Sequence, residues 1–214
     1  MNDFWTWVRF AWHNCLRNLR RSLVTTAIAM LGTAAILLAG GFALFTYDSL
    51  AQPSARDTGH LVLGTPAHFA QDEDVPLQNG LDAVAALRGT LLADPAVRHV
   101  LPRVAFSGLV SNGDKSVVML AQGVEPDSEF AVKGPFLTVR SGHLLESDAA
   151  QPQVMLGDDL ARSLKAGPGS SLTLLASTTE GAMNAIDVVV TGTFTTGVPE
   201  MDKRAVYTSV QVAQ

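Results

Sequence analysis

The sequence predicts an α+β protein in which one N-terminal transmembrane helix precedes an exported domain. The first observation is that Leu23–Tyr47 contains no Asp, Glu, Lys, Arg or His, and the second is that arginines cluster before this segment. The third is that short strand patterns and helix patterns are mixed after residue 48, which is typical of α+β domains. The 214 residues, 47% of them hydrophobic, suffice for a substantial core.

The apolar segment Leu23–Tyr47 is long enough to cross a membrane. As a helix of roughly 25 residues at about 1.5 Å each it would extend about 37 Å, more than the about 30 Å of hydrocarbon, so it can span with some tilt. A cleaved signal peptide is one alternative, because SLAQPSA at 49–55 offers small residues for cleavage, but its apolar region is usually only about 7–15 residues. A buried core helix is the other. We predict a retained transmembrane helix.

Residues 1–22 form a predicted cytoplasmic leader that lies at the membrane interface. They carry four basic residues and one acidic residue, whereas residues 48–214 carry eleven basic and nineteen acidic residues. Positive charge stays in the cytoplasm, so the N-terminus is expected inside and the C-terminal domain in the periplasm. Tryptophan and arginine favour the interfacial region. The predicted interfacial anchors are Trp5, Trp7, Trp12, Arg17, Arg20 and Arg21.

Small side chains recur on successive turns of the predicted transmembrane helix, at 23–47. Such residues allow a second helix to approach closely, although Ala and Gly are also common in membrane helices without that role. Under the first interpretation the span packs against helices of a partner, since this chain supplies only one. The candidate packing residues are Ala29, Gly32, Thr33, Ala35, Ala39 and Gly40.

The exported part begins with a polar connector at 48–58, followed by a predicted strand at 60–65 with alternating apolar residues. A loop at 66–80 leads to a predicted helix at 81–92, where apolar residues recur at helical spacing before Asp94-Pro95. One amphipathic helix therefore follows one strand.

A β-hairpin is predicted between residues 97 and 124, because two β-rich runs flank SNGDK and Asn112-Gly113 favours a tight turn. The later elements are listed in chain order. They are a turn or short helix at 125–133, a strand within 136–145, a strand from 154, a helix at 158–164, a glycine turn at 167–169, strands at 171–177 and 185–194, and a final run at 205–213.

No motif for catalysis, nucleotide binding or metal binding emerges. The Gly167–Ser171 turn lacks the lysine of a phosphate-binding loop, and no G-x-S-x-G nucleophile motif occurs. The exported histidines are scattered without ligand spacing, and the acidic exported part offers no basic surface for nucleic acid. With Cys15 as its one cysteine, the chain forms no internal disulfide. We expect no catalytic residue, cofactor, metal or nucleic-acid partner.

A series of motifs in the exported part resembles that of a known transporter family. The leader ends in NLRRS, and the domain carries SGHLLESDAAQPQVMLGDDLARSLKAGPGSSLTLLAS and VVVTGTFTTGVPEMDKRAVYTSV. This order resembles the permease subunits of the MacB and LolC/LolE (FtsX-like) superfamily of ABC transporters. The family's G-x-x-L, LG-x-x-LA-x-x-L, glycine-turn, V-x-G-x-F and aspartate-strand patterns fall on Gly142–Leu145, Leu156–Leu164, Gly167–Leu175, Val190–Phe194 and Asp202–Val206.

The resemblance implies a periplasmic core domain over 48–214 with two subdomains. A split α+β, porter-like part would comprise 60–94 and 186–214, and an inserted β-rich, sabre-like part 97–185. It also implies mechanotransmission, in which ATP binding to a separate cytoplasmic ABC ATPase subunit moves the membrane helices and paired exported domains respond. The other implied partners are a second permease copy or paralogue, membrane lipid, and a periplasmic lipoprotein, carrier or adaptor. The family has three further membrane helices, so we expect a fragment or a short natural form.

No ATPase domain precedes the span, which favours the arrangement of the lipoprotein-releasing permeases in the bacterial inner membrane. The loop at 176–187 looks shorter than the chaperone-docking hook of some such subunits and lacks an aromatic residue or proline. Its candidate partner contacts are Thr179, Glu180 and Met183. We predict lipoprotein release or export of an amphipathic envelope substrate. Drug or peptide efflux with an adaptor and outer-membrane channel, and a membrane-anchored periplasmic binding or scaffold protein, are the alternatives.

Overall fold

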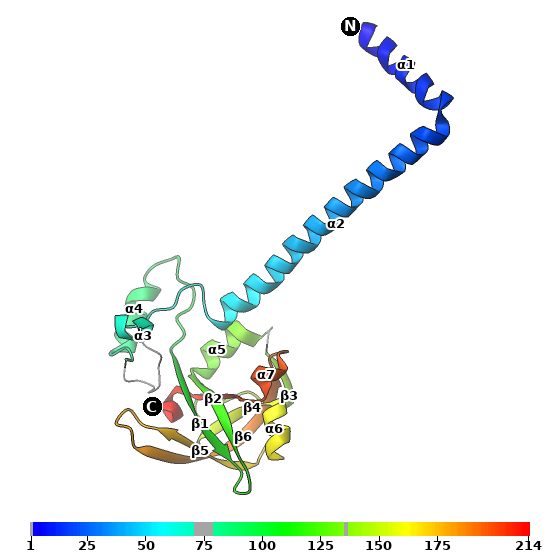
Figure 1. The fold of residues 1–214 in the computed structure, drawn as a ribbon. Helices are drawn as coiled ribbons and strands as arrows, with labels where there is room; N and C mark the ends of the chain where they lie inside the picture. The colour runs from blue at the N-terminus through cyan, green and yellow to red at the C-terminus, as the bar shows by residue number, and fades with distance from the viewer. Residues whose placement is uncertain (1, 71–78, 135–136) are drawn as a thin grey trace. The chain divides into compact units, whose positions relative to one another are not determined.

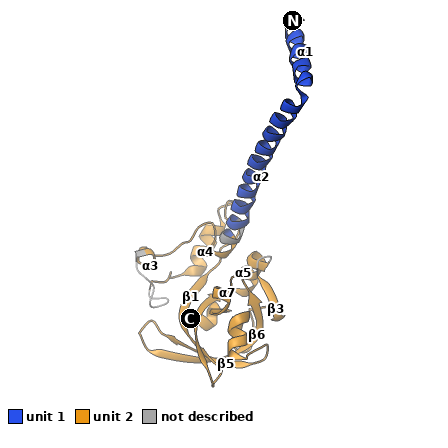
Figure 2. Ribbon diagram, turned by 45° about the vertical axis from the view of Figure 1, so that its right-hand side comes forward, with its two compact units in different colours: residues 1–55 blue, residues 56–214 orange. Residues whose placement is uncertain are grey.

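The computed structural model describes residues 2–70, 79–134 and 137–214. The chain divides into two compact units, Met1–Ala55 and Arg56–Gln214 (Figure 2). The first unit holds the leader and the apolar helix, and the second holds all the strands of the described residues.

Two helices make up the N-terminal unit. Helix α1 is Asn2–Arg17, and helix α2 is Leu19–Asp57, so the last two residues of α2 belong to the second unit. The predicted connector at 48–58 is therefore mostly helical.

The segment after α2 differs from the sequence prediction. The predicted strand at 60–65 is wrong, since these residues adopt no strand and Leu61 is 92% exposed. Alternating apolar residues form a stable strand only where a neighbouring strand and a core are available. Helix α3, Pro66–Ala70, occupies the start of the predicted loop at 66–80, of which residues 71–78 lie outside the described residues.

Helix α4, Val84–Leu92, confirms the helix predicted at 81–92 and begins three residues later than expected. Ala83 precedes it with a φ of 50°, a left-handed conformation that a helix interior excludes. The helix ends before Asp94, whose side chain accepts a hydrogen bond of 2.8 Å from the N–H of Ala96.

Seven strands within the described residues form one sheet, with the order β3-β6-β4-β7-β2-β1-β5. They are β1 Arg103–Ser111, β2 Ser116–Val124, β3 Thr138–Gly142, β4 Gln153–Gly157, β5 Ser171–Ser177, β6 Met183–Thr195 and β7 Ala205–Ser209. Strand β5 also pairs with β6, so every strand except β3 belongs to a closed ring (Figure 1). The first half of β6 pairs with β5 and its second half with β4 and β3, and this double pairing closes the barrel.

The β1–β2 hairpin confirms the reversal predicted at Asn112-Gly113. Ser111 lies opposite Ser116, and the N–H of Asn112 donates to the carbonyl of Lys115 at 3.2 Å. The Asn112 side chain accepts hydrogen bonds from the N–H groups of Asp114 and Lys115, and Gly113 has a φ of +91°. Glycine adopts this conformation without steric cost, which favours a two-residue turn.

Four short helices complete the second unit: α5 Pro126–Lys133, α6 Asp158–Leu164, α7 Pro199–Asp202 and α8 Val210–Ala213. Helices α5 and α6 confirm the predictions at 125–133 and 158–164. Helix α6 follows β4 directly, so its apolar side reaches the interior of the barrel.

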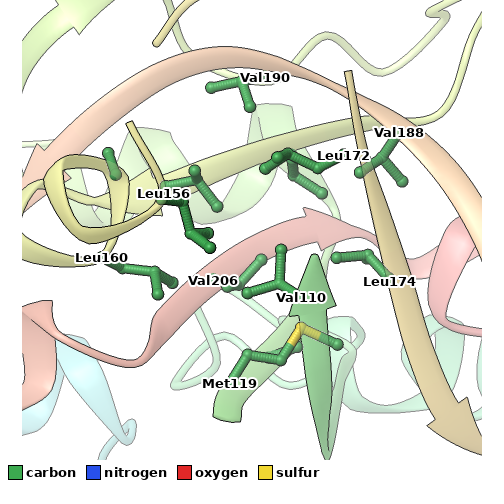
Figure 3. Close-up of a cluster of buried hydrophobic side chains, with 13 residues drawn as sticks. Val110, Met119, Leu156, Leu160, Leu172, Leu174, Val188, Val190 and Val206 are labelled. Atoms are coloured by element: carbon green, nitrogen blue, oxygen red, sulfur yellow. The ribbon is translucent and has the colours of Figure 1, made fainter. Parts of the chain in front are cut away.

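The barrel interior is filled by aliphatic side chains that point toward one another (Figure 3). Strand residues contribute most of this cluster, and Leu160 of α6 packs into it with no exposed surface. A second cluster lies where α5 covers the sheet, with Phe130 edge-on to Tyr207 at a centroid distance of 6.2 Å. Its buried members are Val124, Phe130, Leu145, Met155, Phe194 and Tyr207.

The helices and mixed sheet confirm the predicted α+β class. The barrel pairs β2, from the predicted sabre-like part, in parallel with β7, from the predicted porter-like part. Residues 56–214 cluster as one compact unit, and the division into porter-like and sabre-like subdomains stays a prediction.

Candidate functional site

Helix α2 is the one helix of the described residues that is long and apolar enough to cross a membrane, with a mean hydropathy of 2.2 in its most apolar window. The candidate packing residues all lie on it and are exposed within the described structure. Gly32 and Gly40 leave open space where a Cβ would be. Thr33 donates from its hydroxyl to the carbonyl of Ala29 at 2.9 Å, which satisfies this polar group inside the helix.

The candidate interfacial anchors lie on α1 and at the start of α2. Trp5, Trp7 and Trp12 are each at least 65% exposed, and Arg20 and Arg21 precede the apolar run. Their location is compatible with contact with lipid headgroups, and this role stays a prediction.

The predicted partner-contact loop is the connection between β5 and β6. Its turn spans 178–182 and places Thr179 and Glu180 at the tip. Met183 is the first residue of β6, opposite Ser177, so it lies beside the turn and not at its tip. The Met183 side chain is nevertheless 66% exposed and remains accessible beside the turn.

A buried charge cluster lies between α5, β1 and β7 and consists of Arg103, Glu129, Lys133 and Tyr207. Arg103 donates to both carboxylate oxygens of Glu129, from Nε at 2.9 Å and from Nη2 at 2.8 Å. Lys133 lies 3.3 Å from the same carboxylate and donates to the Tyr207 hydroxyl at 2.6 Å. The Glu129 side chain is only 1% exposed.

Burial of a carboxylate is costly unless cations and hydrogen bonds compensate for the lost water. Two cations flank Glu129, so the cluster satisfies this condition. Burial by itself lowers the pKa of Lys133, but attraction to Tyr207 and Glu129 and the hydrogen bond to Asp57 outweigh it, so the pKa is raised above its ordinary value. Lys133 is therefore charged at neutral pH.

Sequence reasoning missed the charge cluster. Glu129 and Lys133 are four residues apart on a predicted helix, but this spacing is typical of an exposed ion pair. Arg103 comes 26 residues earlier in the chain than Glu129, and no local pattern indicates that the hairpin brings it under α5.

Asp202, which the resemblance singled out, holds the end of β6 to α7. Its carboxylate accepts hydrogen bonds from the Thr195 hydroxyl at 2.5 Å, and from the N–H and hydroxyl of Thr196 at 2.8 and 2.7 Å. Burial raises the pKa of Asp202, but these hydrogen bonds and the attraction of Arg140 outweigh burial and lower it. The interaction stabilises the fold.

Across the residues that the structure describes, no three His, Cys, Asp or Glu side chains gather in a group that could hold a metal ion. The charged groups that do meet are ion pairs, for example Arg88 with Glu125 at 2.7 Å. The Arg88–Glu125 pair joins α4 to the start of α5.

A long apolar helix followed by an α+β barrel is typical of membrane-anchored proteins that carry a folded domain outside the bilayer. The family model described as the MacB-like periplasmic core domain matches residues 22–214. The chain belongs to this family, which confirms the resemblance seen in the sequence. It carries the periplasmic domain type of ABC-transporter permeases related to MacB, LolE and FtsX.

Individual relatives are more distant. The chain is 31% identical over 97 residues to the lipoprotein-releasing system transmembrane protein LolE of Haemophilus influenzae, a match that covers 44% of this chain and 23% of LolE. Among solved structures, the extracellular domain of the noncanonic ABC-type transporter YknZ from Gram-positive bacteria matches with a TM-score of 0.45 and 15% identity, over 58% of this chain and 60% of that chain. The chain thus matches less than a quarter of the length of LolE.

Proposed function

We propose that this chain is the membrane subunit of a mechanotransmission-type ABC transporter, which works with a separate ATPase and acts on lipoproteins or another amphipathic envelope substrate. The carrying observation is that one family match, over 22–214, includes both the apolar helix and the folded domain. A soluble binding domain would not need an apolar helix within the region that the family model matches.

The course of α2 supports a mechanical role. The helix extends from Leu19 beyond the apolar residues to Asp57. A flexible linker after the apolar residues would instead absorb motion of the membrane segment. Motion of the membrane segment is then delivered to the exported domain, and no substrate has to pass through this chain. The arginines at 17–21 favour a cytoplasmic N-terminus and a periplasmic barrel.

The partners follow from this proposal. Permeases of this family work with an ABC ATPase, so the proposal assigns ATP hydrolysis to a cytoplasmic subunit. The small residues of α2, including Gly32 and Gly40, pack against membrane helices of the same complex. A second permease copy or a paralogue supplies the other exported domain.

A reconstitution experiment tests the function. The natural full-length protein is purified with its ATPase subunit, placed in proteoliposomes with a triacylated lipoprotein, and the lipoprotein released to the soluble fraction is measured with ATP and with a non-hydrolysable analogue. We expect release of the lipoprotein with ATP and no release with the non-hydrolysable analogue. ATP hydrolysis without release of lipoprotein, together with ATP-dependent movement of an apolar drug or peptide, would favour the efflux alternative.

Photo-crosslinking separates the same alternatives in cells. A photoreactive amino acid at Glu180 or Met183 reports on the β5–β6 connection, and one at the exposed Asp114 of the β1–β2 turn serves as the control. Capture of a lipoprotein or its soluble carrier at the β5–β6 connection supports lipoprotein release. Capture of a coiled-coil adaptor supports efflux. Failure to recover any ABC ATPase with the solubilised protein favours an anchored binding or scaffold protein.

A further inference from the structure

The end of helix α2 is capped by residues of the exported domain. Arg103 donates to the carbonyl of Asp57 and, at 3.5 Å, to the carbonyl of Arg56. Lys133 Nζ lies 2.9 Å from the Asp57 carboxylate. The last carbonyls of a helix have no partner within the helix, and a cation near them also interacts favourably with the helix dipole. Arg103 therefore supplies from β1 a cap that α2 cannot supply itself.

The capping is reciprocal. Arg56 donates from Nη1 to the carbonyl of Val132 at 2.9 Å, and Val132 is in the last turn of α5. Each of the two helix ends thus receives an arginine that comes from another element. This arrangement joins the final residues of α2 to α5 through the backbone of both helices.

Glu129 organises the two cations that reach the end of α2. Its buried carboxylate holds Arg103 through two hydrogen bonds and lies 3.3 Å from Lys133. Tyr207 fixes the same lysine to β7, with Nζ also 4.8 Å from the centre of the ring. Both cations therefore have partners within the folded domain in addition to Asp57.

We propose that Arg103, Glu129 and Lys133 are positioning residues that hold the end of α2 to the barrel, so that displacement of the helix reaches β1 and β7. The consequence for transport rests on the function proposed above, whereas the holding of the helix end does not.

Hydrogen exchange on the natural full-length protein in nanodiscs tests the holding of the helix end. We expect Arg103→Gln to speed amide exchange at Arg56 and Asp57 about tenfold, and Asp57→Asn about threefold, because the last turn then opens more often. Asp57→Asn changes a side chain that is 68% exposed and leaves the buried charges paired. Unchanged exchange in both variants would overturn the proposal.

Two further variants keep the exchange experiment interpretable. Arg103→Gln combined with Glu129→Gln removes the ion pair without an unpaired buried carboxylate, and it should give the same fast exchange if the single variant unfolds. Arg162→Gln is the matched control, because Arg162 is 70% exposed and pairs only with the nearby Asp158 and Asp159 on α6. Faster exchange at Arg56 in this control would also contradict the proposal.

ATP-dependent release then tests the coupling. Asp57→Asn and the double variant should release substrate several-fold more slowly. The associated ATPase should keep its activity, since neither variant changes the ATPase subunit or the apolar segment of α2. Normal release despite fast exchange at the helix end would overturn the coupling. A wild-type protein without ATP-dependent release would reject the proposed function, and the exchange result would still decide whether the helix end is held.

Discussion

Gly157 and Asp202 approach each other so closely that no side-chain carbon fits between them. A Cβ on Gly157 would lie 2.8 Å from the carbonyl carbon and 2.9 Å from the Cα of Asp202. Gly157 ends β4 and precedes α6, whereas Asp202 ends α7. The contact therefore packs α7 directly against the exit of the central strand.

Gly157→Ala is expected to destabilise the second unit, residues 56–214, by about 1–3 kcal/mol, because the backbone of Asp202 has to move. Chemical denaturation of the detergent-solubilised protein, followed by circular dichroism, measures the loss. Gly89→Ala in α4 is the control. It meets no atom within 4 Å, so it should be neutral or stabilising by up to about 1 kcal/mol. An unchanged denaturation midpoint for Gly157→Ala would contradict the packing argument.

The hydrogen bonds to Asp202 predict a stability that depends on pH. The pKa of Asp202 is lower in the folded than in the unfolded protein, so its contribution is present above the ordinary pKa of about 3.9 and is lost as the pH falls below it. Asp202→Asn should cost about 1–3 kcal/mol at pH 7.

Melting temperatures of the wild type and of Asp202→Asn between pH 7 and pH 3 measure this effect. The difference in Tm should shrink as the pH falls below about 4, since the wild-type carboxylate then also becomes neutral. Asp148→Asn, at an exposed aspartate, is the control and should follow the wild type. A constant difference in Tm across this range would show that the charge of Asp202 makes no contribution.

Leu160 closes the barrel interior from α6. Because it is completely buried, Leu160→Ala should leave a cavity and cost about 2–5 kcal/mol. Leu61→Ala makes the same chemical change at a side chain that is 92% exposed and should change stability by less than about 0.5 kcal/mol. Equal effects of the two variants on the denaturation midpoint would rule out α6 as part of the core.

The small residues of α2 predict a sensitive helix–helix contact. Gly40→Leu should weaken association with the partner membrane helices, because a bulky side chain prevents close approach. Gly41→Leu is the matched control, since a neighbouring residue points about 100° further around the helix and Gly41 is equally open. Co-purification of a tagged and an untagged copy, and of the ATPase, measures association. An equal loss for both variants would argue against a specific packing side.

The local elements of the fold were readable from the sequence where side chains near in sequence determine them. Asn112-Gly113 indicated the hairpin, because the turn makes its own hydrogen bonds. The helix 158–164 was also correct, since it is bounded by the strand before it and by Lys165, which has a φ of 51°. These signals act within a few residues and need no knowledge of the rest of the chain.

Long-range relations were not readable in this way. Alternation at 60–65 predicted a strand, but no neighbouring strand pairs with it there in the described structure. The double pairing of β6 and the parallel pairing of Leu120 with Ala205 join distant segments. The burial of Glu129 likewise depends on Arg103 arriving from the hairpin. Periodicity reports which side of an element is apolar, but not which element covers it.

Strand β7, at Ala205–Ser209, lies between β2 and β4 in the sheet. During synthesis a polypeptide emerges in order from its N-terminal side, so the position between these two strands stays empty until residues 205–209 have emerged. Folding that waits for such distant contacts is slow, and the waiting strands present unpaired edges that attract other chains. The domain is therefore most prone to aggregation before β7 pairs with β2 and β4. Its yield in the cell depends on how quickly this last strand is added to the sheet.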